Sequence, residues 1–270
     1  MPQEVPQLRF ATTRLGNGLQ VHYAEQGDPD EEAIVFVHGW PDSWFSFSRV
    51  LGLLPERYRA YAFDQRGFGD SERPTCCYGI DDLAVDVVAF LDAIGVERAS
   101  LVGHSLGSFS ARRTAETRPE RLARLVLIGS AVTARNQVLL EVQASLRTLE
   151  DPVPAEFARE FQSSTAYLPL PEVFFERIVA ESLKLPAPLW REVLDGVIAF
   201  DDAADLGRIT APTLLIWGEQ DALFPREEQD RLVAAIPDAR LLVYPETGHC
   251  PNWERPERVA KDLDAFLRKG

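Results

Sequence analysis

The sequence predicts an α/β protein built on one mostly parallel sheet with helices on both faces. Short continuous apolar runs, such as 33–37 and 99–102, are typical of strands buried on both faces. Segments with helical periodicity separate these runs, and strands that alternate with helices form parallel sheets. The alternation stops between about 131 and 205, so the 270 residues suit one large domain with one insertion.

The elements can be taken in order along the chain. The turn Gly16-Asn17-Gly18 between two alternating segments indicates an antiparallel hairpin. Apolar residues at helical spacing from 80 to 94 predict a helix, and acidic residues at its start suit the positive end of the helix dipole. The expected strands are 8–13, 19–25, 33–37, 59–63, 99–102, 124–128, 212–217 and 240–244, and the expected helices are 43–54, 80–94, 106–117, 225–236 and one beginning near Pro256.

The stretch 131–205 contains no convincing strand, and its prolines come in pairs. Because proline is poorly tolerated inside a helix, these pairs divide the stretch into about four helical pieces. We expect a helical cap, or lid, at 131–205 and a core domain made of 1–130 and 206–270. The proline pairs are Pro152 and Pro154, Pro169 and Pro171, and Pro186 and Pro188.

Composition excludes several classes of partner. The formal net charge of −14 at pH 7 would repel nucleic acids and anionic membranes. No apolar run is long enough to span a bilayer, and residues 1–10 lack the pattern of a signal peptide. Cys76, Cys77 and Cys250 have no metal-binding spacing, and the adjacent pair is poorly placed to form a disulfide. We therefore expect a reduced, cytoplasmic protein, either a monomer or a homodimer.

The pentapeptide Gly103-His104-Ser105-Leu106-Gly107 fits the G-x-S-x-G pattern of a nucleophile elbow. A predicted strand precedes it and a predicted helix follows it, as that pattern requires. Ser105 would lie in a strained turn, so the residues two before and two after it must lack clashing side chains. The Leu106 amide would lie at a helix N-terminus, where unpaired N–H groups favour an anion. We predict that Ser105 is a nucleophile.

A serine nucleophile needs an adjacent base, and the chain has four histidines. His249 follows the last predicted strand, and ligand sites of parallel sheets collect at the carboxyl ends of the strands. His249 is therefore the predicted base. His22 is expected at an edge or on the surface of the hairpin, His104 is expected to point elsewhere and pack, and His38 is expected to pin its own loop.

The base in turn needs a carboxylate that orients it. Asp221 follows the strand at 212–217, again at a carboxyl end. Ser105, Asp221 and His249 then occur in the chain order that accompanies a G-x-S-x-G elbow. Glu219 is the nearest rival of Asp221.

The loops after the third and fourth predicted strands have different expected roles. The oxyanion of a tetrahedral intermediate needs two N–H donors, and the Leu106 amide is one of them. The third strand's loop supplies the second, for which the Trp40 amide is well placed. The Trp40 indole is expected to form a pocket wall. Asp64 and Asp70 are expected to brace their own glycine-rich turn through bonds to backbone amides.

Five ordered motifs resemble those of the α/β-hydrolase superfamily, over essentially the whole chain. They are His38-Gly39-Trp40-Pro41, Asp64-Gln65-Arg66-Gly67-Phe68-Gly69-Asp70-Ser71, Gly103-His104-Ser105-Leu106-Gly107, Gly218-Glu219-Gln220-Asp221 and Gly248-His249. The resemblance implies an α/β-hydrolase fold with an eight-stranded sheet. The first motif, with Trp44, resembles the branch of epoxide hydrolases and haloalkane dehalogenases, which use an aspartate where this chain has Ser105. Epoxide hydrolases also use paired cap tyrosines, and the insertion holds only Tyr167, so both departures argue against these two activities.

Serine-bearing members of this superfamily include esterases, lactonases, C–C bond hydrolases and perhydrolases. We predict a carboxylesterase that needs no cofactor or metal and forms an acyl-enzyme on Ser105 from a small, apolar ester. The alternatives are a C–C hydrolase or lactonase with the same triad, and a ligand receptor that turns over slowly. Most aromatic residues of the insertion are expected to pack, and the candidates for the pocket wall are Phe161, Trp190, Phe224 and Trp253.

Overall fold

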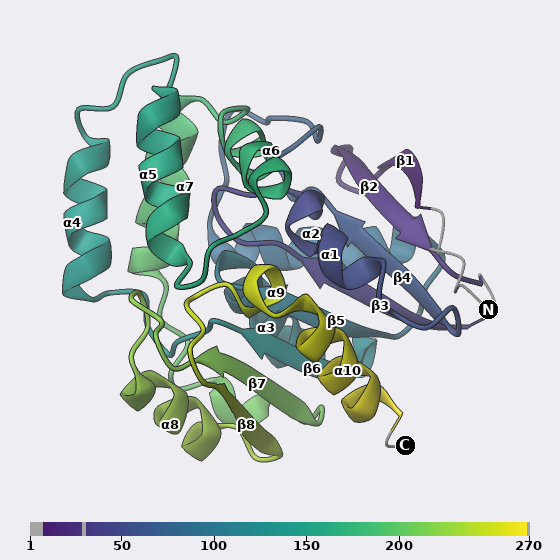
Figure 1. Ribbon diagram of the computed structural model, residues 1–270. Helices are drawn as coiled ribbons and strands as arrows, with labels where there is room; N and C mark the ends of the chain where they lie inside the picture. The colour runs from purple at the N-terminus through teal and green to yellow at the C-terminus, as the bar shows by residue number, and fades with distance from the viewer. Residues whose placement is uncertain (1–7, 29–30, 269–270) are drawn as a thin grey trace.

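The structure, a computed structural model, describes residues 8–28 and 31–268. Its centre is an eight-stranded sheet in the order β1-β2-β4-β3-β5-β6-β7-β8 (Figure 1). β1 pairs antiparallel with β2 and β2 with β4, and all the other neighbours are parallel. The strands are β1 (Arg9–Arg14), β2 (Gln20–Gln26), β3 (Glu32–Val37), β4 (Tyr58–Phe63), β5 (Ala99–His104), β6 (Leu122–Ile128), β7 (Thr213–Gly218) and β8 (Ala239–Tyr244). The predicted fold class is confirmed.

Helices cover both faces of the sheet because its central strands are apolar on both sides. In β3, Ile34 and Phe36 pack with α1 and α10, whereas Val35 and Val37 pack on the opposite face with α2, α3 and α8. The alternation follows from the two-residue repeat of a strand. These helices are α1 (Ser48–Leu51), α2 (Ile80–Ala93), α3 (Leu106–Thr117), α8 (Arg226–Ala235), α9 (Pro251–Glu254) and α10 (Pro256–Leu267).

The helix expected at 43–54 is shorter than predicted. Ser43 caps a 3₁₀ turn, η1 (Trp44–Phe47), which continues into the single turn of α1. Pro55 disfavours helical backbone in the residue before it, which helps to explain why the helix does not continue. Residues 1–7, part of the segment expected to lack a signal peptide, lie outside the described residues. No described helix is both long and apolar enough to cross a membrane.

Four α-helices lie between β6 and β7, within residues 131–205, and we call these residues the insertion. Their helices stand together to one side of the sheet (Figure 1). Pro154, Pro171 and Pro186, one from each predicted pair, are the N-cap residues of the second, third and fourth helix. The four helical pieces predicted from the prolines are therefore present. They are α4 (Gln137–Leu146), α5 (Ala155–Thr165), α6 (Glu172–Ser182) and α7 (Ala187–Ala199).

A buried arginine of α3 fastens both ends of the insertion to the core. Arg112 donates from Nε and Nη2 to the two carboxylate oxygens of Asp202, at 2.7 and 2.6 Å. It also donates to the backbone carbonyls of Ala131 and Val132. Both charged side chains are completely buried, where an ion pair is tolerated only if its groups are well hydrogen-bonded. The insertion is thus held by the helix that follows Ser105.

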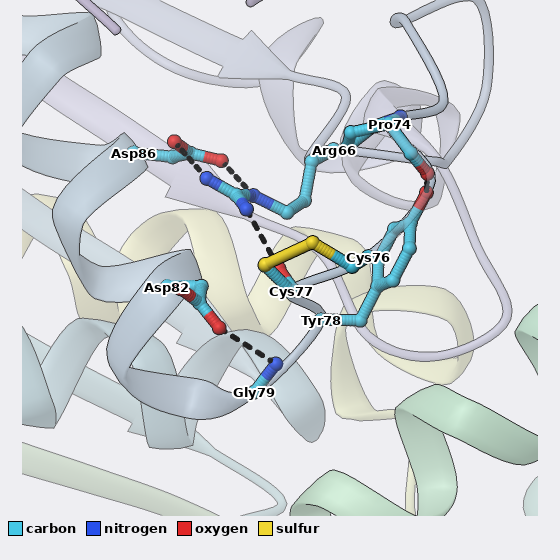
Figure 2. The surroundings of a disulfide bond; sticks show 8 residues. All are labelled: Arg66, Pro74, Cys76, Cys77, Tyr78, Gly79, Asp82 and Asp86. Atoms are coloured by element: carbon cyan, nitrogen blue, oxygen red, sulfur yellow. Dashed lines mark hydrogen bonds and ion pairs between the residues drawn. A yellow bond between two sulfur atoms is a disulfide. The ribbon is translucent and has the colours of Figure 1, made fainter.

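Cys76 and Cys77 form a disulfide between neighbouring residues (Figure 2), so the expectation that they would not pair is wrong. That expectation rested on the usual separation of bridged Cα atoms, and neighbouring residues can pair only where the backbone adopts a special conformation. Cys77 has a φ of 76°, and its carbonyl accepts a hydrogen bond of 2.6 Å from Arg66 Nη1. Arg66 is itself held by both carboxylate oxygens of Asp86. The cysteine content therefore no longer argues for a reducing compartment.

Candidate active site

Ser105 lies in the sharp turn between β5 and α3. Its φ of 50° and ψ of −120° are strained for a residue with a side chain. A Cβ on Gly103 would lie 2.3 Å from the Gly107 carbonyl oxygen, and one on Gly107 would lie 2.0 Å from the Val37 carbonyl oxygen. The prediction that neither position tolerates a side chain is confirmed.

His249 and Asp221 meet at the carboxyl ends of β7 and β8. His249 Nδ1 lies 2.9 Å from Asp221 Oδ2, and both side chains are almost fully buried. The other carboxylate oxygen, Oδ1, accepts the backbone amides of Leu223 and Phe224 at 2.8 and 3.0 Å. These bonds hold the carboxylate in place. Because a carboxylate oxygen only accepts hydrogen bonds, His249 Nδ1 is assigned as the donor. His249 Nε2 is left buried, with no hydrogen-bond partner among the described residues.

Gly129, at the end of β6, makes room for the imidazole of His249. A Cβ there would lie 3.0 Å from both Nδ1 and Cε1 of that ring. The same strand end positions the nucleophile, because the Ser105 amide donates to the Ile128 carbonyl at 3.0 Å. Sequence reasoning missed this role for Gly129. The signal that could have indicated it is a glycine at the carboxyl end of the strand next to the one that leads into Ser105.

The loop after β3 lies directly against the nucleophile. A Cβ on Gly39 would lie 3.1 Å from Ser105 Cβ. His38 pins this loop as predicted: its Nδ1 lies 2.7 Å from the Gly39 carbonyl oxygen, and its Nε2 accepts the Gln65 amide at 3.1 Å. Burial lowers the pKa of His38, which keeps it neutral in this role. The Trp40 amide is therefore carried on a loop with a defined position.

His104 packs as predicted, but it packs at the site. Its Nε2 lies 3.2 Å from the backbone carbonyl oxygen of His249, and the two ring centroids are 5.2 Å apart. Burial lowers the pKa of His104 well below its usual range, so the ring is neutral and its Nε2 donates the proton. The Nδ1 atom is left without a partner among the described residues.

His22 lies away from these groups, half-buried on β2. Its Nδ1 lies 2.9 Å from Asp64 Oδ2, and this hydrogen bond raises the pKa of His22. Asp64 braces its turn as predicted by accepting the Asp70 amide at 3.0 Å, whereas the Asp70 carboxylate binds Lys184 of the insertion at 2.8 Å. Potential ligand atoms of these three residues lie within 4.8 Å of one another. Because each carboxylate already has protein partners, we assign no metal to this group.

A small cavity lies between the elbow and the insertion, and both Ser105 and His249 line it. Most of its wall is apolar or aromatic, including the Trp40 side chain as expected. Phe161, Phe224 and Trp253, three of the four residues predicted for the pocket wall, also line this cavity, and their contact with a substrate stays a prediction. None of the described residues that line the cavity is lysine or arginine.

Trp190 is not among the described residues that line the cavity, so its predicted place in the pocket wall gains no support from this geometry. Its side chain is fully buried behind the wall, with ring centroids 5.2 Å from Trp40 and 5.9 Å from Phe161. Trp190 and Phe161 lie on different helices of the insertion. Periodicity identifies both as inward-facing, but only the packing of α5 against α7 decides which of them reaches the cavity.

The insertion is also bonded to the loop that carries His249. The His249 amide donates to the Thr165 carbonyl at 2.9 Å. The Glu254 carboxylate accepts the Gly248 amide at 2.9 Å and the Tyr167 amide at 3.0 Å, which ties the end of α5 to the histidine loop. Sequence reasoning did not identify Glu254, because its partners are brought to it by tertiary packing.

Comparison with known proteins agrees with this architecture. A family model described as the alpha/beta hydrolase fold matches residues 32–256. The 2-hydroxy-6-oxononadienedioate/2-hydroxy-6-oxononatrienedioate hydrolase of Burkholderia vietnamiensis is 30% identical over 268 residues, covering 94% of this chain and 93% of that protein. The bifunctional esterase/perhydrolase of Acinetobacter calcoaceticus is 29% identical over 285 residues, covering 96% and 99%. The solved structure of a membrane phospholipase A, a bacterial virulence factor, is 29% identical with a TM-score of 0.83, covering 96% and 86%.

The mostly parallel sheet and its flanking helices define an α/β protein of the hydrolase type. The chain belongs to the alpha/beta hydrolase fold family, as its motifs predicted. Its relatives include a bifunctional esterase/perhydrolase as well as a hydrolase named for 2-hydroxy-6-oxononadienedioate and 2-hydroxy-6-oxononatrienedioate, so the family by itself leaves the substrate open.

Proposed function

We propose that the chain hydrolyses carboxylic esters without a cofactor, with Ser105 as nucleophile, His249 as base and Asp221 as the group that orients the base. The observation that carries this proposal is the buried bond of 2.9 Å between His249 Nδ1 and Asp221 Oδ2. It leaves His249 Nε2 without a partner in the cavity that Ser105 also lines. A neutral imidazole with an available Nε2 can take the serine proton.

The reaction would proceed in two halves. In the first, Ser105 Oγ attacks the ester carbonyl while His249 Nε2 takes its proton. The tetrahedral intermediate then collapses, the C–O bond to the alcohol breaks, and His249 returns the proton to the leaving alcohol. In the second half, His249 deprotonates a water that attacks the acyl-enzyme. The carboxylic acid leaves and Ser105 regains its proton.

The amides of Trp40 and Leu106 would hold the oxyanion in both halves. Leu106 is the first residue of α3, where N–H groups have no partner within the helix. Trp40 follows Gly39, which lies against Ser105 as described above. Two fixed N–H donors stabilise the transition state, in which this negative charge develops, more than they stabilise the ground state.

Hydrolysis of a C–C bond is the second candidate, and the relative from Burkholderia vietnamiensis favours it. That relative is named for a dioate, which carries two carboxylates. The cavity offers no lysine or arginine among the described residues that line it, and a buried anion needs a partner of opposite charge. The cavity therefore fits an uncharged ester better.

A cytoplasmic location and a monomeric or homodimeric state stay predictions.

The proposal can be tested by labelling the wild-type protein with an organophosphonate and then measuring turnover. We expect one residue to be modified stoichiometrically, peptide mass mapping to place it on Ser105, and aryl esters of graded acyl length to be hydrolysed. Label on another residue would refute the proposed nucleophile. Labelled Ser105 without ester turnover would favour the C–C hydrolase, the lactonase or the slow receptor over the esterase.

A further inference from the structure

Asp42 is a buried carboxyl group in the wall of the same cavity, and the proposed ester mechanism does not use it. It follows the loop of Gly39 and Trp40 and is 1% exposed. Its partners are neutral: Gln162 Nε2 donates to Oδ1 at 2.9 Å and Ser46 Oγ donates to Oδ2 at 3.2 Å. Among the described residues, no lysine or arginine forms an ion pair with it.

Both donors are themselves fixed. Gln162 belongs to α5 of the insertion, is buried, and also donates from Nε2 to Ser182 Oγ at 2.8 Å. Ser46 Oγ accepts the indole N–H of Trp253, another residue of the cavity wall, at 2.8 Å. The carboxyl group of Asp42 is thus held from the core on one side and from the insertion on the other.

The carboxyl group lies close to the nucleophile. The point where Gly39 would carry a Cβ is 3.4 Å from Asp42 Oδ2, 3.1 Å from Ser105 Cβ and 3.0 Å from His104 Nδ1. Because Gly39 has no side chain, nothing from that residue separates these three groups. A substrate bound at Ser105 would therefore meet the field of this carboxyl group.

Burial without a cationic partner raises the pKa of Asp42 to about 7. The hydrogen bonds from Gln162 and Ser46 oppose this shift, as does His249 when it is charged, while Glu181 of α6 adds to it. His104, on β5, is neutral as described above. Near neutral pH the carboxyl group is therefore present in both its uncharged and its charged form.

We propose that Asp42 determines substrate charge specificity, so that the site accepts uncharged esters and rejects esters that carry a carboxylate on the acyl chain. This inference rests on the proposed esterase function and names its substrate class. Like charges repel strongly in a buried cavity, and no lysine or arginine among the described wall residues offsets Asp42. Because more Asp42 is charged at higher pH, discrimination against an anionic ester increases as pH rises through the neutral range.

The test compares two esters of equal chain length, p-nitrophenyl hexanoate and the mono-p-nitrophenyl ester of adipic acid. The quantity measured is the ratio of kcat/KM for the neutral ester to that for the anionic ester. Any effect of pH that is common to both esters cancels in this ratio. We expect the wild-type ratio to rise about tenfold from about pH 6 to about pH 8, a range in which the substrate carboxyl stays charged.

Asp42→Asn keeps an oxygen for the Gln162 amide and removes the charge. We expect its ratio at about pH 8 to fall about tenfold below the wild-type ratio and to lose its pH dependence, because with a pKa of about 7 only about a tenth of Asp42 is uncharged at about pH 8. Asp92→Asn makes the same change of net charge at an exposed ion pair with Arg121 and should behave as wild type. Organophosphonate labelling of Ser105 checks that each variant retains its elbow.

A wild-type ratio that stays flat over this pH range would overturn the inference, whether or not Asp42→Asn folds. An unchanged ratio in a folded, labelled Asp42→Asn protein would also overturn it. Failure of the proposed esterase function has a different signature, because p-nitrophenyl hexanoate would then not be turned over by the wild type at all.

Discussion

The core loops and the insertion both line the cavity, but they hold their groups in different ways. On the core side, backbone geometry dominates: Ser105 lies in a strained turn, and backbone amides hold the carboxylate of Asp221. On the insertion side, side chains of α5 reach the cavity, as Phe161 and Gln162 do. We therefore propose that the reaction steps depend on the sheet and its loops, whereas substrate selection depends on the packing of the insertion helices. That packing can vary without disturbing the sheet.

The two buried carboxyl groups of the site show the same contrast. Asp221 accepts two backbone amides and faces a histidine that becomes charged during the proposed reaction. Asp42 has only neutral side-chain donors, one of them from the insertion, and its pKa is raised to about 7. Two carboxyl groups in one site can therefore take different roles because their surroundings differ.

Removing the nucleophile tests the core side of this comparison with the largest expected effect. Ser105→Ala should abolish organophosphonate labelling and lower kcat on esters by about a millionfold, leaving only what the oxyanion hole and binding supply. Ser163→Ala, at an exposed serine of the insertion, is the matched control and should keep full activity. Labelling that persists in Ser105→Ala would contradict the elbow assignment.

The orienting carboxylate should have the next largest effect. Asp221→Asn should lower kcat by about ten thousandfold, because an amide favours the wrong tautomer of His249. Glu219→Gln is the control: Glu219 is exposed, and its variant should retain activity. If the Glu219 variant lost activity and the Asp221 variant did not, the acid would be misassigned.

Trp190→Ala tests how much the packing of the insertion contributes to the stability of the protein. Removing a fully buried tryptophan should lower the free energy of unfolding by about 3–5 kcal/mol. Denaturant unfolding measures this loss, and the preference for acyl length should stay close to that of the wild type. A stable variant with altered preference would show that Trp190 reaches the substrate after all.

Phe161→Ala tests whether the insertion determines substrate selectivity, and it has the smallest expected effect. Phe161 lines the cavity, so its truncation should shift the relative kcat/KM of long and short acyl chains by about tenfold. The rate of Ser105 labelling by a small sulfonyl fluoride should change little. An unchanged chain-length profile would leave Phe161 only a packing role.

Much of the architecture could be predicted from the sequence. Short apolar runs, proline pairs and glycine spacing act within a few residues. They therefore indicated the succession of strands along the chain, the four helices of the insertion and the tight turn at Ser105. The same local reasoning proposed Ser105, Asp221 and His249 as a triad, because each follows a strand of a parallel sheet. Their catalytic roles stay predictions.

Tertiary structure alone decided which distant groups meet. Arg112 binds Asp202, 90 residues away, and Gln162 binds Asp42 across 120 residues. It also decided that Phe161 rather than Trp190 lines the cavity. The physical reason is that secondary structure depends on nearby residues, whereas such contacts depend on how whole helices and loops pack against one another.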